Sequence, residues 1–122
     1  MIRGVRGAIT VVSNSEAEIL SATKELLNMM LVRNNISEED ISSIIFSMTP
    51  DLDAVFPARA ARELGMRHVA LFCTQEIDVS GSLGKCIRIL MDHETERSQK
   101  DINHVYLRDA VRLRPDISGR DD

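Results

Sequence analysis

The sequence predicts an α+β fold in which one long helix packs against a single mixed β-sheet. One long segment, residues 15–34, repeats apolar side chains at helical spacing, whereas several shorter apolar segments are rich in β-branched residues and end in turn signals. In chain order they predict strand, helix, strand, helix, strand and strand, followed by a further element near the C-terminus. The chain has 122 residues, 43% of them apolar, so we expect one domain spanning residues 1–122.

The first strand and the long helix are expected in the N-terminal third. Residues 2–12 are rich in β-branched side chains, and Gly4 and Gly7 interrupt them, as glycines do where backbones approach closely or a strand bulges. At the start of the helix, Ser15 and Glu18 have the spacing of a capping box. In this motif the hydroxyl and the carboxylate each accept a hydrogen bond from a backbone N–H of the first turn.

The remaining elements are expected to be shorter. Their predicted positions are a turn at 37–40, a buried strand at 41–48, a helix at 56–64, strands at 68–74 and 86–91, a helical turn at 98–103 and an edge strand at 105–113. Pro57 suits the first turn of the second helix, and Gly65 suits the position just past its end. We expect the tail from about residue 114 to be loose.

Composition and charge exclude several classes of function. The formal net charge is −4 and aromatic residues make up only 3% of the chain, whereas nucleic-acid binding needs a basic surface or stacking rings. No apolar run reaches the ~18 residues of a membrane-spanning helix, and the N-terminus lacks the apolar region of a signal peptide. These features predict a cytoplasmic protein without a nucleic-acid or membrane partner. Its two cysteines make neither a disulfide framework nor a metal motif.

The arginines of this acidic chain are scattered singly along the sequence. If folding gathers several of them, they form a local anion site and not a general basic face. They include Arg3, Arg6, Arg59, Arg62, Arg88 and Arg114. Arg88 is the most informative, because it lies inside an apolar strand where burial requires an anionic partner. An exposed position on one face of an antiparallel sheet explains it equally well.

A few other polar residues invite a chemical interpretation. Glu76 directly follows an apolar strand and precedes a glycine-containing loop, where ligands often bind, although a surface position is an equal alternative. Cys73 has no neighbouring base, which favours packing over nucleophilic catalysis. The run Asp92-His93-Glu94 lies in a strand, where neighbours point to opposite faces, so structural or solvated roles are favoured over metal binding. No glycine-rich nucleotide-binding motif is present.

Seven segments together resemble the AroH-class chorismate mutases. The matches run in the order of the family over nearly the whole chain, at compatible spacing. They are residues Ile2–Ala8, Thr49–Leu52, Ala54–Ala60, Gln75–Val79, Lys85–Arg88, His104–Leu107 and Leu113–Asp116. The resemblance implies a trimeric pseudo-α/β-barrel with an active site at each subunit interface. It also implies the Claisen rearrangement of chorismate to prephenate, on the branch to phenylalanine and tyrosine, without a metal or cofactor.

The resemblance also implies a set of site residues. Arg6, Glu76 and Arg88 match the catalytic positions of the family. Substrate-binding positions in the same subunit are matched by Phe72, Cys73, Thr74 and Tyr106, and those contributed by a neighbouring subunit by Phe56, Ala58, Arg59, Arg62 and Leu113. The sequence departs from the common pattern at Arg59, where a lysine is often found, and at Leu71, Phe72 and Thr74. These departures alter the expected wall and rim of the pocket.

Two other functions compete with a mutase. One is a trimer similar to the YjgF-like imine deaminases, which also bind small carboxylates through an arginine between subunits. The other is a regulatory domain that senses a metabolite of the aromatic pathway. The combination of Arg6, Glu76 and Arg88 favours the mutase, and conversion of chorismate by purified protein separates all three.

Overall fold

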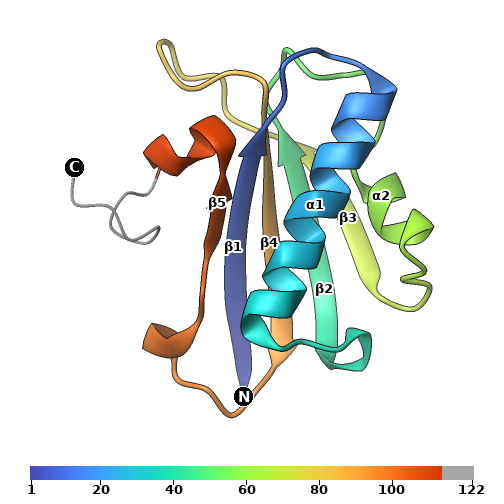
Figure 1. Ribbon diagram of the computed structural model, residues 1–122, viewed down its shortest axis with the longest axis vertical. Coiled ribbons are helices and arrows are strands. Elements are labelled where there is room, and N and C mark those ends of the chain that lie inside the picture. The colour runs from blue at the N-terminus through green and yellow to red at the C-terminus, as the bar shows by residue number, and fades with distance from the viewer. Residues whose placement is uncertain (114–122) are drawn as a thin grey trace.

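The computed structural model describes residues 1–113, in which five strands form one sheet and both α-helices lie on one of its faces (Figure 1). The strands are β1 (Ile2–Thr10), β2 (Ile41–Met48), β3 (Ala70–Gln75), β4 (Cys86–Glu94) and β5 (Val105–Leu107). The α-helices are α1 (Glu16–Asn34) and α2 (Ala58–Glu63), and three short 3-10 helices are η1 (Glu38–Asp40), η2 (Gln99–Asp101) and η3 (Arg108–Leu113).

The strand order β3-β2-β4-β1-β5 makes β4 the central strand. It is antiparallel to both β2 and β1, whereas the edge strands β3 and β5 run parallel to β2 and β1, respectively. The sheet is therefore mixed, and the predicted α+β class is confirmed. Since β1 and β2 run in the same direction on either side of β4, α1 connects them by crossing one face of the sheet (Figure 1).

The hydrophobic core fills the space between the sheet and α1. Leu26 and Met30 of α1 are fully buried in one cluster with Val5 and Ile9 of β1. Helix and strand approach most closely at Gly7, where an added Cβ would lie 2.6 Å from Met30 Sδ and 3.0 Å from Leu26 Cδ1. This glycine therefore allows α1 to lie directly on β1, which explains one of the two glycines in the first strand.

Half of the predicted capping box is present at the start of α1. Ser15 Oγ accepts a hydrogen bond from Glu18 N at 3.2 Å, as expected of an N-cap. The Glu18 carboxylate does not return to Ser15; it accepts hydrogen bonds from Val12 N at 2.8 Å and from Ser13 Oγ at 3.1 Å. The bond from Val12 N is the main reason why the pKa of Glu18 lies below its usual value. This carboxylate thus fixes the connection from β1 to α1.

Several predicted boundaries were wrong by a few residues. The first strand ends at Thr10, and α2 is shorter than the predicted 56–64, with Pro57 at its N-cap position. β3 spans 70–75 and not 68–74, because its pairing with β2 begins at Ala70. β4 extends beyond residue 91 to Glu94, because it pairs with the whole of β1.

The predicted edge strand at 105–113 is only partly correct. β5 has three residues, and Arg108 then adopts a left-handed backbone with φ 55°, which ends the strand and begins η3. The Arg108 side chain donates to the Thr10 carbonyl at 3.0 Å, and Asp109 N donates to Thr10 Oγ1 at 3.2 Å. These bonds join η3 to the end of β1. The predicted loose tail from residue 114 lies outside the described residues.

The face of the sheet opposite the α-helices is covered at one end only within residues 1–113, where Ala110 and Leu113 of η3 pack with Ala8 and Cys86. The rest of it is the uncovered face. Apolar side chains of three strands are exposed there: Ile45 of β2, Phe72 of β3 and Leu90 of β4. No helix in this part of the chain is long and apolar enough to cross a membrane.

The approach of α1 to β1 predicts that Gly7→Ala destabilises the protein. The added methyl group displaces Met30 and Leu26 within a filled core, and such overpacking lowers the free energy of unfolding by about 1–3 kcal/mol. Gly4→Ala in the same strand is the matched control, because its Cβ would lie 3.3 Å from its nearest neighbours. Thermal unfolding at one fixed protein concentration should give a clearly lower midpoint for Gly7→Ala. Equal midpoints for the two variants would contradict this account.

Candidate active site

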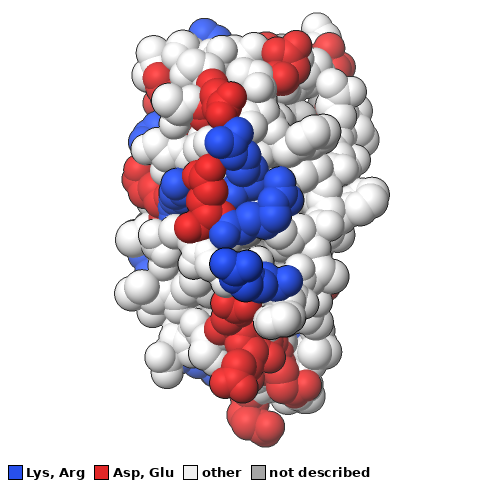
Figure 2. All heavy atoms as spheres, turned by 90° about the vertical axis from the view of Figure 1, so that its right-hand side faces the viewer, with Lys and Arg blue, Asp and Glu red and all other residues white. Residues whose placement is uncertain are grey.

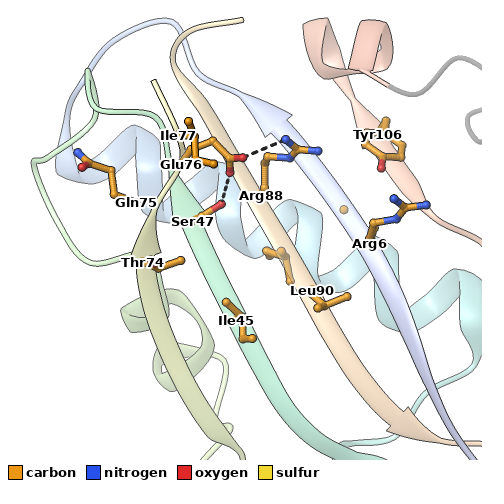
Figure 3. Close-up of a pocket in the computed structure, with 12 residues that line it drawn as sticks. Arg6, Ile45, Ser47, Thr74, Gln75, Glu76, Ile77, Arg88, Leu90 and Tyr106 are labelled. Atoms are coloured by element: carbon orange, nitrogen blue, oxygen red, sulfur yellow. Dashed lines mark hydrogen bonds and ion pairs between the residues drawn. The ribbon is translucent and has the colours of Figure 1, made fainter. Parts of the chain in front are cut away.

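An open cleft of about 300 Å³ lies on the uncovered face of the sheet (Figure 3). Five residues expected at the site line it: Arg6, Thr74, Glu76, Arg88 and Tyr106. They come from β1, the end of β3, β4 and β5, so four segments that are distant in sequence meet here. Ser47, Ile45 and Leu90 complete the floor between them.

Glu76 is the centre of the hydrogen bonding in the cleft. Its Oε1 accepts a hydrogen bond from Arg88 Nη1 at 3.1 Å, and its Oε2 accepts one from Ser47 Oγ at 2.6 Å (Figure 3). The side chains of Glu76 and Arg88 are 28% and 36% exposed, so this ion pair is partly accessible to solvent and to a ligand. Each carboxylate oxygen thus has one fixed partner, while its remaining lone-pair sites can accept further donors.

The strand register places Arg88 beside Glu76. Ile87 and Ile89 are buried in the core, so alternation along β4 directs Arg88 to the uncovered face. Ser47 of β2 lies opposite Arg88 in the register, and Glu76 continues the ladder from β3 by donating its backbone N–H to the Met48 carbonyl at 2.9 Å. Both explanations of Arg88 from the sequence therefore apply, because it lies on an open face and also meets a carboxylate.

Arg6 and Tyr106 form the other side of the cleft (Figure 3). The Arg6 backbone N–H donates to His104 Nδ1 at 2.9 Å, which extends the pairing of β1 with β5. Within residues 1–113 the Arg6 guanidinium has no hydrogen-bond or ion-pair partner, and the buried Tyr106 hydroxyl has none either. The Arg6 guanidinium is therefore available to a ligand at this end of the cleft, and the Tyr106 hydroxyl is a buried polar group without a partner beside it.

The charges in the cleft favour an anionic ligand. Its lining carries two guanidinium groups, Arg6 and Arg88, against one carboxylate, Glu76. Since an arginine presents five N–H donors, most of the donors on these two side chains remain for a ligand. The structure thus gathers two of the scattered arginines into a local positive site on a chain whose net charge is −4.

The side chains of Phe72 and Cys73 do not line the cleft. Cys73 packs against the core on the helix side of β3, as does Leu71. Phe72 projects from the opposite face but is 64% exposed and lies outside the lining. The other cysteine, Cys86, is buried behind Tyr106, and burial raises the pKa of its thiol to about 11. Neither position supports a nucleophilic cysteine.

The residues expected from a neighbouring subunit lie away from the cleft. Figure 2 shows basic and acidic side chains gathered on the side of the molecule that carries α2. There Arg59 binds Glu16 at 2.7 Å and Glu63 at 3.0 Å, and the hydrogen bond that it donates to Glu63 is the largest cause of a raised Arg59 pKa. Arg62 borders a separate hollow beside β3.

Phe56, Ala58 and Leu113 are the other residues expected from a neighbouring subunit, and they differ in their surroundings. Phe56 is exposed in the segment before α2, whereas Ala58 is buried in the core. Leu113 packs against the small cluster that contains Tyr106. A single chain therefore does not unite Phe56, Ala58, Arg59 or Arg62 with Arg88.

Sequence reasoning missed the contributions of Ser47 and His104. A serine in a strand is a weak signal, and the only cue at residue 47 was a polar side chain on the same face as Ile45. His104 was noted within a family segment, but its bond to the Arg6 backbone depends on the pairing of β1 with β5. Neither contact could be derived before the register was known.

In the run Asp92-His93-Glu94, the side chains of His93 and Glu94 make contacts within the protein. His93 is buried and its Nδ1 lies 3.0 Å from the Arg3 carbonyl, while Glu94 pairs with the N-terminal amine. Residues 1–113 contain no group of three or more His, Cys, Asp or Glu side chains able to hold a metal ion.

Comparisons with known proteins agree with the geometry. A sequence model of the family described as chorismate mutase type I matches residues 2–117. Chorismate mutase AroH of Bacillus subtilis is 51% identical over 119 residues, which cover 97% of this chain and 94% of that protein. Chorismate mutase AroH of Thermus thermophilus is 49% identical over 118 residues, which cover 96% of this chain and 97% of that protein.

A solved structure leads to the same family. The chorismate mutase from Clostridium thermocellum superposes with a TM-score of 0.87 at 52% identity, covering 88% of this chain and 96% of that one. The family model and the two relatives each cover nearly the full sequence, so they include every strand and helix that forms the cleft. The chain therefore belongs to the type I chorismate mutase family and is an isomerase of that class.

Proposed function

We propose that the cleft between Arg6, Glu76 and Arg88 binds chorismate and catalyses its Claisen rearrangement to prephenate. The observation that carries the proposal is the meeting, in one cleft, of two guanidinium groups, a single carboxylate and an unpartnered tyrosine hydroxyl. Membership of the chorismate mutase family supplies the substrate. The reaction serves the branch to phenylalanine and tyrosine, and we expect it to take place in the cytoplasm.

The chemistry of the rearrangement fits these side chains. One C–O bond of the substrate breaks while one C–C bond forms, and the electrons remain within the substrate throughout. The protein therefore needs neither a nucleophile nor a redox partner for the step. Its tasks are to hold the compact conformer of a dianion and to stabilise negative charge on the ether oxygen.

We assign the residues of the cleft the following roles in this mechanism. Arg88 uses one N–H for Glu76, and we assign its remaining donors to the ether oxygen and a substrate carboxylate. Arg6 and Tyr106 lie together at the other side and bind the carboxylate of the pyruvyl side chain. Glu76 orients Arg88 and accepts a hydrogen bond from the ring hydroxyl. Thr74 lines the wall beside them.

A homotrimer would complete the cleft. The uncovered sheet face exposes Ile45, Phe72 and Leu90, and apolar groups in such a position gain free energy when another surface covers them. Arg59 and Arg62 lie on a different side of the same chain, so in a cyclic assembly they could reach the cleft of the next subunit. We therefore propose that each active site forms between two subunits, with α2 of the neighbour as its rim.

Arg88→Lys should abolish most turnover while preserving the fold. Lysine keeps the charge but lacks the planar set of donors that joins Glu76 to the substrate, and loss of one such group lowers kcat by roughly 10²–10³-fold. Arg3→Lys is the matched control, because Arg3 lies on β1 outside the cleft. The assay follows loss of chorismate and formation of prephenate, with circular dichroism to check folding. Near-native kcat in Arg88→Lys would refute its role.

The wild-type protein in the same assay tests the function itself. Conversion of chorismate to prephenate supports a mutase. Binding of chorismate without conversion would contradict the proposal and favour a sensor.

Mixed trimers test the site between subunits. Arg88→Ala and the double variant Arg59→Ala/Arg62→Ala should each be nearly inactive as homotrimers. When the two are co-expressed with different tags and purified through both, every hybrid trimer has one interface of its three that combines an intact cleft with an intact rim. Activity of the purified hybrids should then recover to about a third of the wild-type value. Hybrids no more active than the two parent variants would exclude a rim supplied by the neighbour.

A further inference from the structure

We infer that Ser47 is a positioning residue for this reaction, whose hydroxyl fixes the Glu76 carboxylate and, through it, the Arg88 guanidinium. The inference rests on the proposed function of the cleft. It assigns to Ser47 an effect on the orientation of Arg88 and not a contact with the reacting atoms.

The hydrogen bonds place Ser47 and Arg88 on different oxygens of one carboxylate. Ser47 Oγ lies 2.6 Å from Glu76 Oε2, and Arg88 Nη1 lies 3.1 Å from Glu76 Oε1 (Figure 3). A carboxylate with a donor on only one oxygen can rotate about its terminal bond, whereas donors on both oxygens fix its plane. The direction of the Arg88 guanidinium depends on that plane, because the two groups share a hydrogen bond.

The backbone and side chain of Ser47 are more rigid than those of Glu76. Ser47 lies in β2, which is paired on one side with β3 and on the other with β4, and its register neighbours are Thr74 and Arg88. Glu76 follows the last residue of β3 and carries a longer side chain with three rotatable bonds. The short serine side chain therefore gives the flexible glutamate a fixed point on a paired strand.

A neutral donor suits this position for an electrostatic reason. Lysine or arginine at residue 47 would also bind Glu76, but it would add a third positive charge beside Arg6 and Arg88. The serine hydroxyl holds the carboxylate without changing the charge that the cleft presents to a dianion. An uncharged residue thus orients Glu76, while the two arginines supply the positive charge that binds the substrate.

An isosteric pair of variants tests this inference. Threonine and valine have the same shape and both suit a strand, but only threonine keeps the hydroxyl. We expect Ser47→Val to lower kcat by roughly 10- to 100-fold relative to Ser47→Thr, because small misplacements of catalytic groups have effects of this size. KM should change by no more than about twofold, since the binding groups remain. Ser43→Ala, on the same face of β2 outside the cleft, is the control.

A second measurement asks whether Ser47 acts through Glu76. In a Glu76→Ala background the Thr and Val variants at residue 47 should have equal kcat, because the carboxylate that distinguishes them is absent. Equal kcat of the two variants in the wild-type background would overturn the inference, as would an undiminished difference in the Glu76→Ala background. A wild-type protein without mutase activity would instead refute the proposed function, so the two failures are distinguishable.

Discussion

Alternation of side chains along β4 is the constraint on which both the core and the cleft depend. Ile87, Ile89 and Met91 point toward α1 and are buried, so the residue between the first two must point away from it. Because β4 is paired on both sides along most of its length, a slip of one residue would exchange the two faces. The packing energy of the core therefore also fixes the position of Arg88.

The electrostatics of the cleft follow from this arrangement. Arg88 reaches Glu76 across β2, while Arg6 comes from β1 on the other side of β4. The two arginines share one sheet face but only one of them has a carboxylate partner in residues 1–113. One guanidinium is thus held in place by protein and the other is left to a ligand, which is consistent with the proposed binding and orientation of a dianion in this cleft.

Local patterns in the sequence predicted most of the fold. α1, β2 and the apolar part of β4 each have a period that a single segment reveals, and their predicted positions were nearly correct. The segment 105–113 was less predictable, because β5 exists only where it pairs with β1 and ends where Arg108 bonds to Thr10. A contact between residues so far apart in sequence leaves no local periodicity.

The site was predictable only in part for the same reason. Arg6, Glu76 and Arg88 were ambiguous one by one, and the family resemblance selected them. That resemblance also joined Phe72, Cys73 and Thr74 in one pocket, although neighbours in a strand point to opposite faces. The alternation places the Cys73 side chain toward the core. Ser47 had no signal strong enough to single it out.

The pairing of the first strand with the late strands has a consequence for synthesis on the ribosome. Ile2 lies opposite Glu94, and Ala8 lies opposite both Arg88 and Tyr106, so β1 finds its partners only after most of the chain has emerged. Contacts of such long sequence separation form slowly. Until then the apolar side of β1 has only α1 to cover it. The packing of α1 on β1 at Gly7 is therefore the contact from which we expect this apolar surface to be covered, and aggregation to be limited, before the sheet is complete.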